Sequence, residues 1–310
     1  MKKFTTHNIH EIMNYLQKNL EQSEEVKIEV LNPDYGFELF AGEQVQLDEL
    51  YTYHSYKAWN DLSELLFCKL LTPEISSKYT VILTFKKVNK NSSFHNNSYT
   101  SNYEKYGEDS LFFRINKNEE PSFLYYYKQA LKNAKIENKI NILNLGINKA
   151  DEFALISELL DEKEINSKQF VGIDFSKSAI NHAKKRFPYD NFNFYCHDIN
   201  DLKSLNLKKA DLLISIGTLQ SSTLNFKKLF MDLFQNYLEE NGSLILGFPN
   251  CRWHGSEMIY GAKAANYSFS EQSVLYKDVY FCKKYLQQKK YRVTLTGKNY
   301  LFLTATSIKK

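Results

Sequence analysis

Short apolar runs alternate with helical patterns through the second half of the chain. Apolar runs of strand length cover residues 140–145, 169–173 and 211–216, and a segment with helical spacing of its apolar residues follows each of them. Right-handed crossovers place such helices on both faces of a parallel sheet. The pattern therefore predicts a doubly wound α/β domain with a ligand site at the carboxyl ends of its strands.

Further elements complete this predicted domain. They are helices over residues 152–160, 177–186, 225–238 and 276–288, and strands over residues 193–195, 243–248, 291–296 and 300–306. A tight-turn signal, Gly297-Lys298-Asn299, separates the last two strands, so we expect the last strand to run antiparallel. The fold class is thus α/β, with a seven-stranded, mostly parallel sheet that ends in an antiparallel β-hairpin.

The first part of the chain has a less regular pattern, typical of an α+β domain. Its predicted elements are helices over residues 10–20 and 55–71, strands over 26–31 and 79–88, and a polar surface loop over 89–107. Glu120-Pro121 then suits the first turn of another helix. We therefore expect an accessory or recognition domain over residues 1–118 and the sheet domain over residues 119–310.

Composition excludes few classes of function. The 310 residues carry a formal net charge of +4, and no block of Lys and Arg exceeds three residues, so nucleic acid is permitted as a partner but not favoured. The four cysteines lack a CxxC spacing, which argues against a disulfide framework and a metal site. No signal-peptide core follows Met1, and no apolar run approaches the roughly 18 residues of a membrane helix. We expect a cytoplasmic protein without membrane contact.

Small and acidic residues stand at the ends of the first three predicted strands. Gly146 follows the first strand, Asp174 follows the second and Asp198 follows the third. Taken singly, Asp174 or Ser176 is an ordinary helix cap and Asp198 an ordinary turn residue. Together, and in this order, they favour a ligand site.

This order of elements, with its glycine, its two acids and its terminal β-hairpin, resembles the class I S-adenosylmethionine-dependent methyltransferases over residues 139–310. The resemblance implies that Gly146 begins the cofactor loop, where a side chain would collide with the ligand. It further implies that Asp174 accepts both ribose hydroxyls and that Asp198 contacts the adenine amino group. The other implied cofactor residues are Phe175 after the ribose acid, Ile199 beside the adenine ring, and Ser215 and Gly217 near the reacting methyl.

The cofactor loop departs from the family pattern. Asn144 stands where the family has an acid, and Asn148 and Ala150 replace its later glycines. Asn144 can form hydrogen bonds but cannot neutralise a cationic group of the cofactor, so Asp151 or Glu152 is the candidate for that charge. A cofactor with extra negative charge and a degenerate, non-catalytic site are the other interpretations. A dinucleotide dehydrogenase would need a GxGxxG turn, which this loop does not provide.

We expect a long loop, rich in polar and aromatic residues, after the fifth predicted strand on the ligand side of the sheet. In it, Arg252 is a candidate anchor for an acidic group, and Trp253 and Tyr260 are candidates for stacking on a ring. His254 and Glu257 are candidate general bases, although a surface imidazole is the commoner role for such a histidine.

A second aromatic group lies at the predicted helix entrance near residue 55. It supplies Tyr56 as a candidate substrate contact and His54 as another candidate base. The alternative interpretation is that these residues only pack in an amphipathic helix. The Asn-Pro-Pro-aromatic motif of enzymes that methylate amino groups of DNA is absent.

We therefore predict methyl transfer from S-adenosylmethionine to an O or N atom of a small-molecule acceptor. A tRNA or protein acceptor recognised by the N-terminal domain is the first alternative. A non-catalytic, cofactor-binding partner protein is the second.

Overall fold

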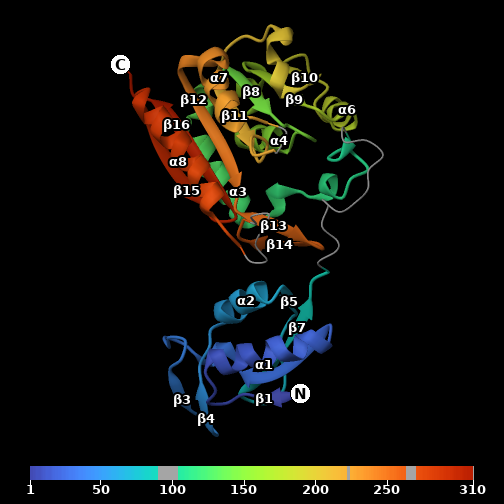
Figure 1. Ribbon diagram of the computed structural model, residues 1–310, viewed down its shortest axis with the longest axis vertical. Helices are drawn as coiled ribbons and strands as arrows, with labels where there is room; N and C mark the ends of the chain where they lie inside the picture. The colour runs from blue at the N-terminus through green and yellow to red at the C-terminus, as the bar shows by residue number, and fades with distance from the viewer. Residues whose placement is uncertain (90–103, 222–223, 263–269, 310) are drawn as a thin grey trace. The chain divides into compact units, whose positions relative to one another are not determined.

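The computed structural model describes residues 1–89, 104–221, 224–262 and 270–309 (Figure 1). Internal contacts divide them into two compact units. The first unit holds residues 1–89 together with Trp253–Ile259, and the second holds the other described residues. The boundary expected after residue 118 differs from this division, because residues 104–118 belong to the second unit. Most of the polar loop expected over 89–107 lies outside the described residues.

A seven-stranded sheet forms the centre of the second unit, in the order β10-β9-β8-β11-β12-β16-β15. The strands from β10 to β12 are parallel, whereas β16 is antiparallel to both β12 and β15. The predicted fold class is confirmed. The strand bounds are β8 Asn141–Leu145, β9 Gln169–Asp174, β10 Phe192–Cys196, β11 Ala210–Ile216, β12 Leu238–Pro249, β15 Tyr291–Gly297 and β16 Tyr300–Ser307.

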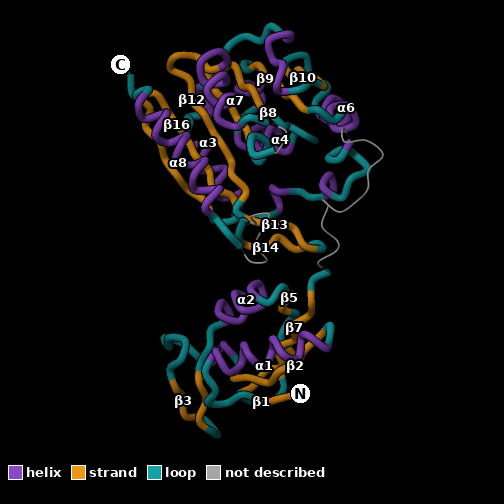
Figure 2. Tube along the Cα trace, viewed as in Figure 1, coloured by secondary structure: helices purple, strands orange, loops and turns teal. Residues whose placement is uncertain are grey.

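Helices connect these strands, as the tube in Figure 2 shows. The α-helices of this unit are α3 Pro121–Asn133, α4 Asp151–Leu159, α5 Glu162–Asn166, α6 Lys177–Arg186, α7 Phe226–Asp232 and α8 Ser273–Gln288. Short 3-10 turns are η3 Phe112–Arg114, η4 Lys117–Glu119, η5 Ile136–Asn138 and η6 Ile199–Leu205, and a π-helical turn, η7, covers Leu233–Tyr237. The helix expected over 225–238 therefore ends earlier as an α-helix, and β12 begins at Leu238, before the expected residue 243.

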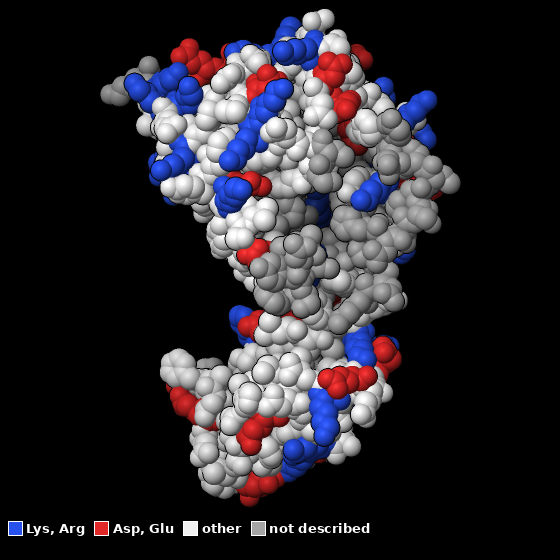
Figure 3. Space-filling model, in the orientation of Figure 1, with Lys and Arg blue, Asp and Glu red and all other residues white. Residues whose placement is uncertain are grey.

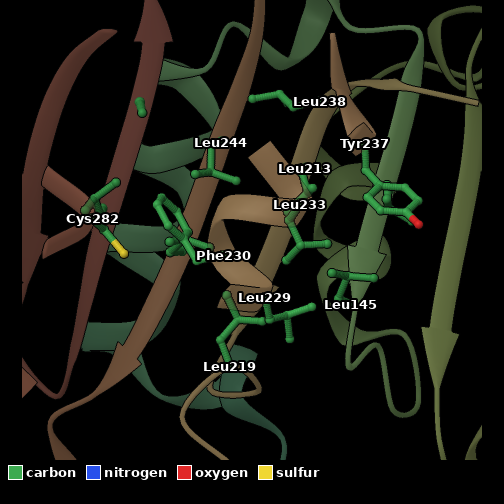
Figure 4. Close-up of a cluster of buried hydrophobic side chains, with 14 of the residues drawn as sticks. Leu145, Leu213, Leu219, Leu229, Phe230, Leu233, Tyr237, Leu238, Leu244 and Cys282 are labelled. Carbon is green, nitrogen blue, oxygen red and sulfur yellow. The ribbon is translucent and has the colours of Figure 1, made fainter. Parts of the chain in front are cut away.

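One face of the sheet carries a core under α7 and α8 (Figure 4). Leu145, Leu213 and Leu244 from three strands lie in it with Phe230 from α7 and Cys282 from α8. Burying an aliphatic or aromatic side chain of this size stabilises the fold by about 1.5–3 kcal/mol. Successive strand residues point to opposite faces. Asn144, next to Leu145, therefore points away from this core.

A smaller sheet, in the order β1-β2-β7-β5 with β6 beside β7, forms the first unit. Its core contains Leu16 from α1, Trp59 from α2 and Phe85 from β7. The bounds are β1 Lys2–Lys3, α1 Ile9–Gln22, β2 Glu25–Leu31, η1 Pro33–Tyr35, β3 Gln44–Gln46, β4 Leu50–Thr52, α2 Tyr56–Leu65, β5 Cys68–Leu70, β6 Glu74–Ile75 and β7 Thr80–Lys87.

The second helix of the first unit ends before the predicted residue 71. Phe67 adopts a left-handed conformation with φ 54°, which no helix continues through, and the chain then enters β5. In the described part of the chain, no helix has both the length and the apolar character needed to cross a membrane.

Candidate functional site

The turn after β8 depends on a glycine. Gly146 has φ +74°, and a Cβ atom at this position would lie 1.9 Å from Thr218 Oγ1, which follows β11. A side chain at this position would therefore meet a neighbouring loop of the protein, and the collision with the ligand stays a prediction. Gly146 therefore lets the loops after β8 and β11 approach each other closely.

Two further residues of this loop adopt the left-handed backbone conformation, although neither is glycine. Asn148 has φ 46° and Ala150 has φ 65°. Asparagine tolerates this conformation better than most residues, and alanine adopts it at a cost of about 1–2 kcal/mol. The two replacements of family glycines thus preserve the glycine-type conformation of the loop.

Asp174 lies where the loops after β8 and β9 meet. Its Oδ2 accepts a hydrogen bond from Asn148 N at 2.9 Å, and its Oδ1 accepts one from Ser176 N at 2.9 Å. Burial raises the pKa of Asp174, and the hydrogen bonds from Ser176 and Asn148 oppose that shift. A carboxylate offers about four lone-pair sites, so a ligand hydroxyl can bind Asp174 beside these backbone donors.

Asn144 is a buried amide without a protein partner. Its side chain is 1% exposed, and neither Nδ2 nor Oδ1 has a hydrogen-bond partner among the described residues. Leaving a buried polar atom unsatisfied costs about 1–3 kcal/mol, so a polar ligand group at this end of β8 would be stabilised. With Gly146 and Asp174, this amide gives a set of residues that fits an adenosyl and methionyl ligand.

Asp151 and Glu152, the candidates for a compensating charge, are both paired inside the protein. Asp151 Oδ1 lies 2.7 Å from Arg186 Nη1, and its Oδ2 lies 3.5 Å from Lys149 Nζ. Glu152 Oε1 lies 3.2 Å from Lys117 Nζ, and burial raises the pKa of Glu152. Both acids are therefore paired with cations of the protein, and a compensating charge from Asp151 or Glu152 toward the cofactor stays a prediction.

The adenine-side candidates lie at the end of β10. Asp198 is exposed and begins η6, where its Oδ1 accepts hydrogen bonds from Asn200 N at 2.8 Å and Asn200 Nδ2 at 3.0 Å. Asp198 is thus the turn residue of the alternative interpretation. Both hydrogen bonds go to one oxygen of its carboxylate. Ile199 is 9% exposed and packs in the core, whereas Phe175 is 43% exposed after Asp174.

The end of β11 supplies Ser215 and Gly217. Ser215 is buried, and its hydroxyl donates to Leu145 O at 3.2 Å, so it ties β11 to β8. Gly217 has φ +74°, and a Cβ atom there would lie 3.4 Å from Pro249 Cγ. The residues expected near the reacting methyl thus lie between the carboxyl ends of β8 and β12.

A family model described as a methyltransferase domain matches residues 136–297, more than half of the chain. The chain belongs to this family. The sheet order and its antiparallel β16 place it in class I, whose methyl donor is S-adenosylmethionine. A comparison with curated proteins gives no match.

Solved structures of other methyltransferases are similar to this one at low sequence identity. Plantazolicin methyltransferase BpumL, in complex with a monoazolic desmethylPZN analogue and SAH, is 21% identical with a TM-score of 0.37, over 48% of this chain and 57% of that chain. N-methyltransferase NodS from Bradyrhizobium japonicum WM9, in complex with SAH, is 14% identical with a TM-score of 0.43, over 66% and 94%. Ribosomal protein L11 methylase from Lactobacillus delbrueckii subsp. bulgaricus is 12% identical with a TM-score of 0.38, over 58% and 76%. The chain thus spans little more than half the length of BpumL.

The segment after β12 of this methyltransferase forms a hairpin where the sequence predicted a loop. Its strands are β13 Cys251–His254 and β14 Glu257–Tyr260, with Gly255 at φ +59° in the turn. Arg252 and Tyr260 belong to the second unit. Burial lowers the pKa of Arg252, and the Tyr260 hydroxyl accepts a hydrogen bond from Gln272 Nε2 at 3.3 Å.

The middle of the hairpin belongs to the first unit. Trp253 is partly buried there, and the His254 ring contacts Phe67 edge to face, with ring centroids 5.7 Å apart. Glu257 Oε1 lies 2.5 Å from Lys69 Nζ. This candidate base is therefore an ion-pair partner in the structure.

The other first-unit candidates lie at the start of α2. His54 is 5% exposed and packs against Trp59, with ring centroids 5.0 Å apart, and burial lowers the pKa of His54. This matches the packing alternative left open by the sequence. Tyr56 is 45% exposed at the first position of α2.

Sequence reasoning missed one segment of the site, residues 104–118, which we call the strap. Tyr106 O accepts a hydrogen bond from Asn148 Nδ2 at 2.7 Å, and Lys149 Nζ donates to Phe113 O at 2.9 Å and to Ile115 O at 2.8 Å. All three acceptors are backbone carbonyls. Their contacts leave no side-chain signal in the sequence, and no periodic pattern marks the strap.

Proposed function

We propose that this methyltransferase transfers a methyl group to an O or N atom of a small-molecule acceptor and holds its cofactor at the loops after β8, β9 and β10. The observation that carries the proposal is the position of the Asp174 carboxylate. It is fixed by one N–H from the β8 loop and one from the β9 loop, beside the Gly146 turn.

The proposed roles follow from the hydrogen-bonding capacity of each group. Asp174 accepts the two ribose hydroxyls with its remaining lone pairs, and Asp198 accepts from the adenine amino group. The buried Asn144 amide pairs with a polar group of the methionyl end. Phe175 and Ile199 line the adenine, and Ser215 and Gly217 shape the end of β11 beside the reacting centre.

The cofactor supplies a methyl group already activated by its sulfonium. The protein therefore has to align the acceptor and exclude water. A general base is needed only for an acceptor that carries a proton on the reacting atom. Among the candidates, His254 ranks first, because His54 is buried in a core and Glu257 is paired with Lys69. Arg252, Trp253, Tyr260 and Tyr56 are the proposed acceptor contacts.

Charge supports a small acceptor over a nucleic acid. The net charge is only +4, and on the face shown in Figure 3 the described basic and acidic side chains are interspersed with uncharged ones. Proteins that bind nucleic acid usually gather their lysines and arginines on one face. An RNA acceptor would instead show as binding that weakens steeply with added salt.

Calorimetry with S-adenosylmethionine and with its demethylated product tests the proposal. We expect the wild type to bind both and Asp174→Asn to weaken both by about 30-fold or more, because a charge-assisted hydrogen bond contributes about 1.5–3 kcal/mol. Asp161→Asn is the matched control, since Asp161 also accepts a backbone hydrogen bond, from Glu164 N, at the start of α5.

Two results would count against the proposal. Wild-type protein that binds neither compound near millimolar concentration would refute the cofactor assignment. Equal affinities for Asp174→Asn and the wild type would refute the ribose role. Binding without methylation of any compound in a metabolite extract, read by mass spectrometry, would favour the non-catalytic alternative.

A further inference from the structure

Glu104, the first described residue of the strap, reaches the start of α6. Its Oε2 accepts hydrogen bonds from Ser176 Oγ at 2.8 Å and Ser178 Oγ at 2.5 Å. Its Oε1 accepts one from Lys177 N at 3.0 Å. Ser176 itself caps α6 by accepting from Ala179 N at 3.2 Å. A carboxylate more than 70 positions earlier in the chain thus completes the cap of this helix.

The same turn holds the proposed ribose acid. Ser176 donates its backbone N–H to Asp174 Oδ1 and its hydroxyl to Glu104 Oε2. Two residues along the strap, Tyr106 O accepts from the side chain of Asn148, whose backbone N–H binds Asp174 Oδ2. The strap therefore contacts two of the residues whose backbone N–H groups bind the Asp174 carboxylate.

The packing around Glu104 leaves little freedom. A Cβ atom at Gly107 would lie 2.0 Å from Glu104 Oε2 and 2.5 Å from Ser178 Oγ. Glu108 N also donates to Ser178 Oγ at 2.9 Å. Figure 1 shows this segment running past α6 before it reaches α3.

The charge state of Glu104 agrees with this role. Burial disfavours its ionised form, but the hydrogen bonds from Ser178 and Ser176 outweigh burial and lower the pKa of Glu104. It is therefore an ionised acceptor at neutral pH. Its negative charge in turn adds to the burial that raises the pKa of Asp174.

We propose that Glu104 is a positioning residue for the cofactor: it fastens the strap across the loops after β8 and β9, so that strap order and adenosyl binding favour each other. This rests on the proposed function, since it takes the residues around Asp174 as the adenosyl site. Coupling of this kind is reciprocal, so a bound cofactor must stabilise the strap as much as the strap stabilises the bound cofactor.

The test compares Glu104→Gln with Glu108→Gln in the full chain. Glu108 also lies on the strap, but its side chain is 53% exposed, and its ion-pair contact in the described part of the chain is with His182 Nδ1, at 3.8 Å. We expect Glu104→Gln to weaken S-adenosylmethionine and S-adenosylhomocysteine by the same factor, about tenfold, because lost charge-assisted hydrogen bonds affect the adenosyl end that both share. Glu108→Gln should change either affinity by less than twofold, and Glu104→Asp should recover part of the loss.

Hydrogen exchange provides a second measurement, which a purely structural cap would not change. In the wild type, S-adenosylhomocysteine should slow exchange at the backbone amides of Glu108 and Ser110, and in Glu104→Gln this slowing should be lost. A lower melting temperature with unchanged affinity would overturn the proposal and make Glu104 a helix cap only. A loss confined to S-adenosylmethionine would also overturn it. If the wild type binds neither compound, the proposed function fails instead.

Discussion

Two glycines in the second unit allow the close approach after β8 to be tested against a matched control. Gly146 and Gly217 have the same backbone conformation, φ +74°. An alanine at either position has to adopt a left-handed conformation, which costs about 1–2 kcal/mol. Their surroundings differ. A Cβ atom at Gly146 would lie 1.9 Å from Thr218 Oγ1 and 2.7 Å from Thr218 Cβ, whereas at Gly217 the nearest atom, Pro249 Cγ, is at 3.4 Å.

Gly146→Ala should therefore cost more than Gly217→Ala. Overpacking of a close contact adds about 1–3 kcal/mol, so we expect the free energy of unfolding to fall by about 2–5 kcal/mol in Gly146→Ala and by about 1–2 kcal/mol in Gly217→Ala. Adding Thr218→Gly removes the three atoms nearest to the new methyl. The cost of Gly146→Ala measured in that background should fall to the value for Gly217→Ala.

Urea unfolding followed by circular dichroism is the suitable assay. Both tryptophans, Trp59 and Trp253, belong to the first unit, so tryptophan fluorescence would report on the wrong part of the chain. Equal losses for the two alanine variants would show that backbone conformation alone requires glycine at 146. A loss in Gly146→Ala that Thr218→Gly does not reduce would refute the contact with Thr218.

Two more predictions concern buried charges. Arg186→Gln leaves the buried Asp151, among the described residues, with Lys149 at 3.5 Å as its remaining ion-pair partner, so the free energy of unfolding should fall by about 2–4 kcal/mol. Lys57→Gln is the control. It breaks an exposed pair with Asp61 and should change the free energy of unfolding by less than about 0.5 kcal/mol. The first unit should lose stability as pH falls from 7 to 5, because burial lowers the pKa of His54 and the unfolded chain takes up a proton near pH 6.5 that the folded unit does not. His54→Phe should flatten this dependence, read from tryptophan fluorescence, since both tryptophans belong to the first unit; an unchanged slope would exclude His54 as its source.

The sequence predicted the elements whose signal lies in their own side chains. Helix α6 has the predicted bounds of residues 177–186. Ser176 caps its start, and lysines and Arg186 occupy its last turn. The hairpin of β13 and β14 was interpreted as a loop, although Gly255-Ser256 provides a two-residue turn, because polar and aromatic residues hide the strand alternation. The contacts of the strap could not be predicted, because the side chains of Asn148 and Lys149 bind its backbone carbonyls, which every residue carries. These carbonyls belong to Tyr106, Phe113 and Ile115.

Asn144 in place of an acid changes the electrostatics of the proposed cofactor site. An ionised acid at a position that is 1% exposed would pay a large desolvation cost unless a cation lay beside it. Lys149 of the cofactor loop is engaged by carbonyls and Asp151, and Lys117 is engaged by Glu152. A neutral amide avoids that cost before the cofactor binds. Asp174 and Glu104, which have no ion-pair partner among the described residues, then place negative charge at the proposed adenosyl end of the site.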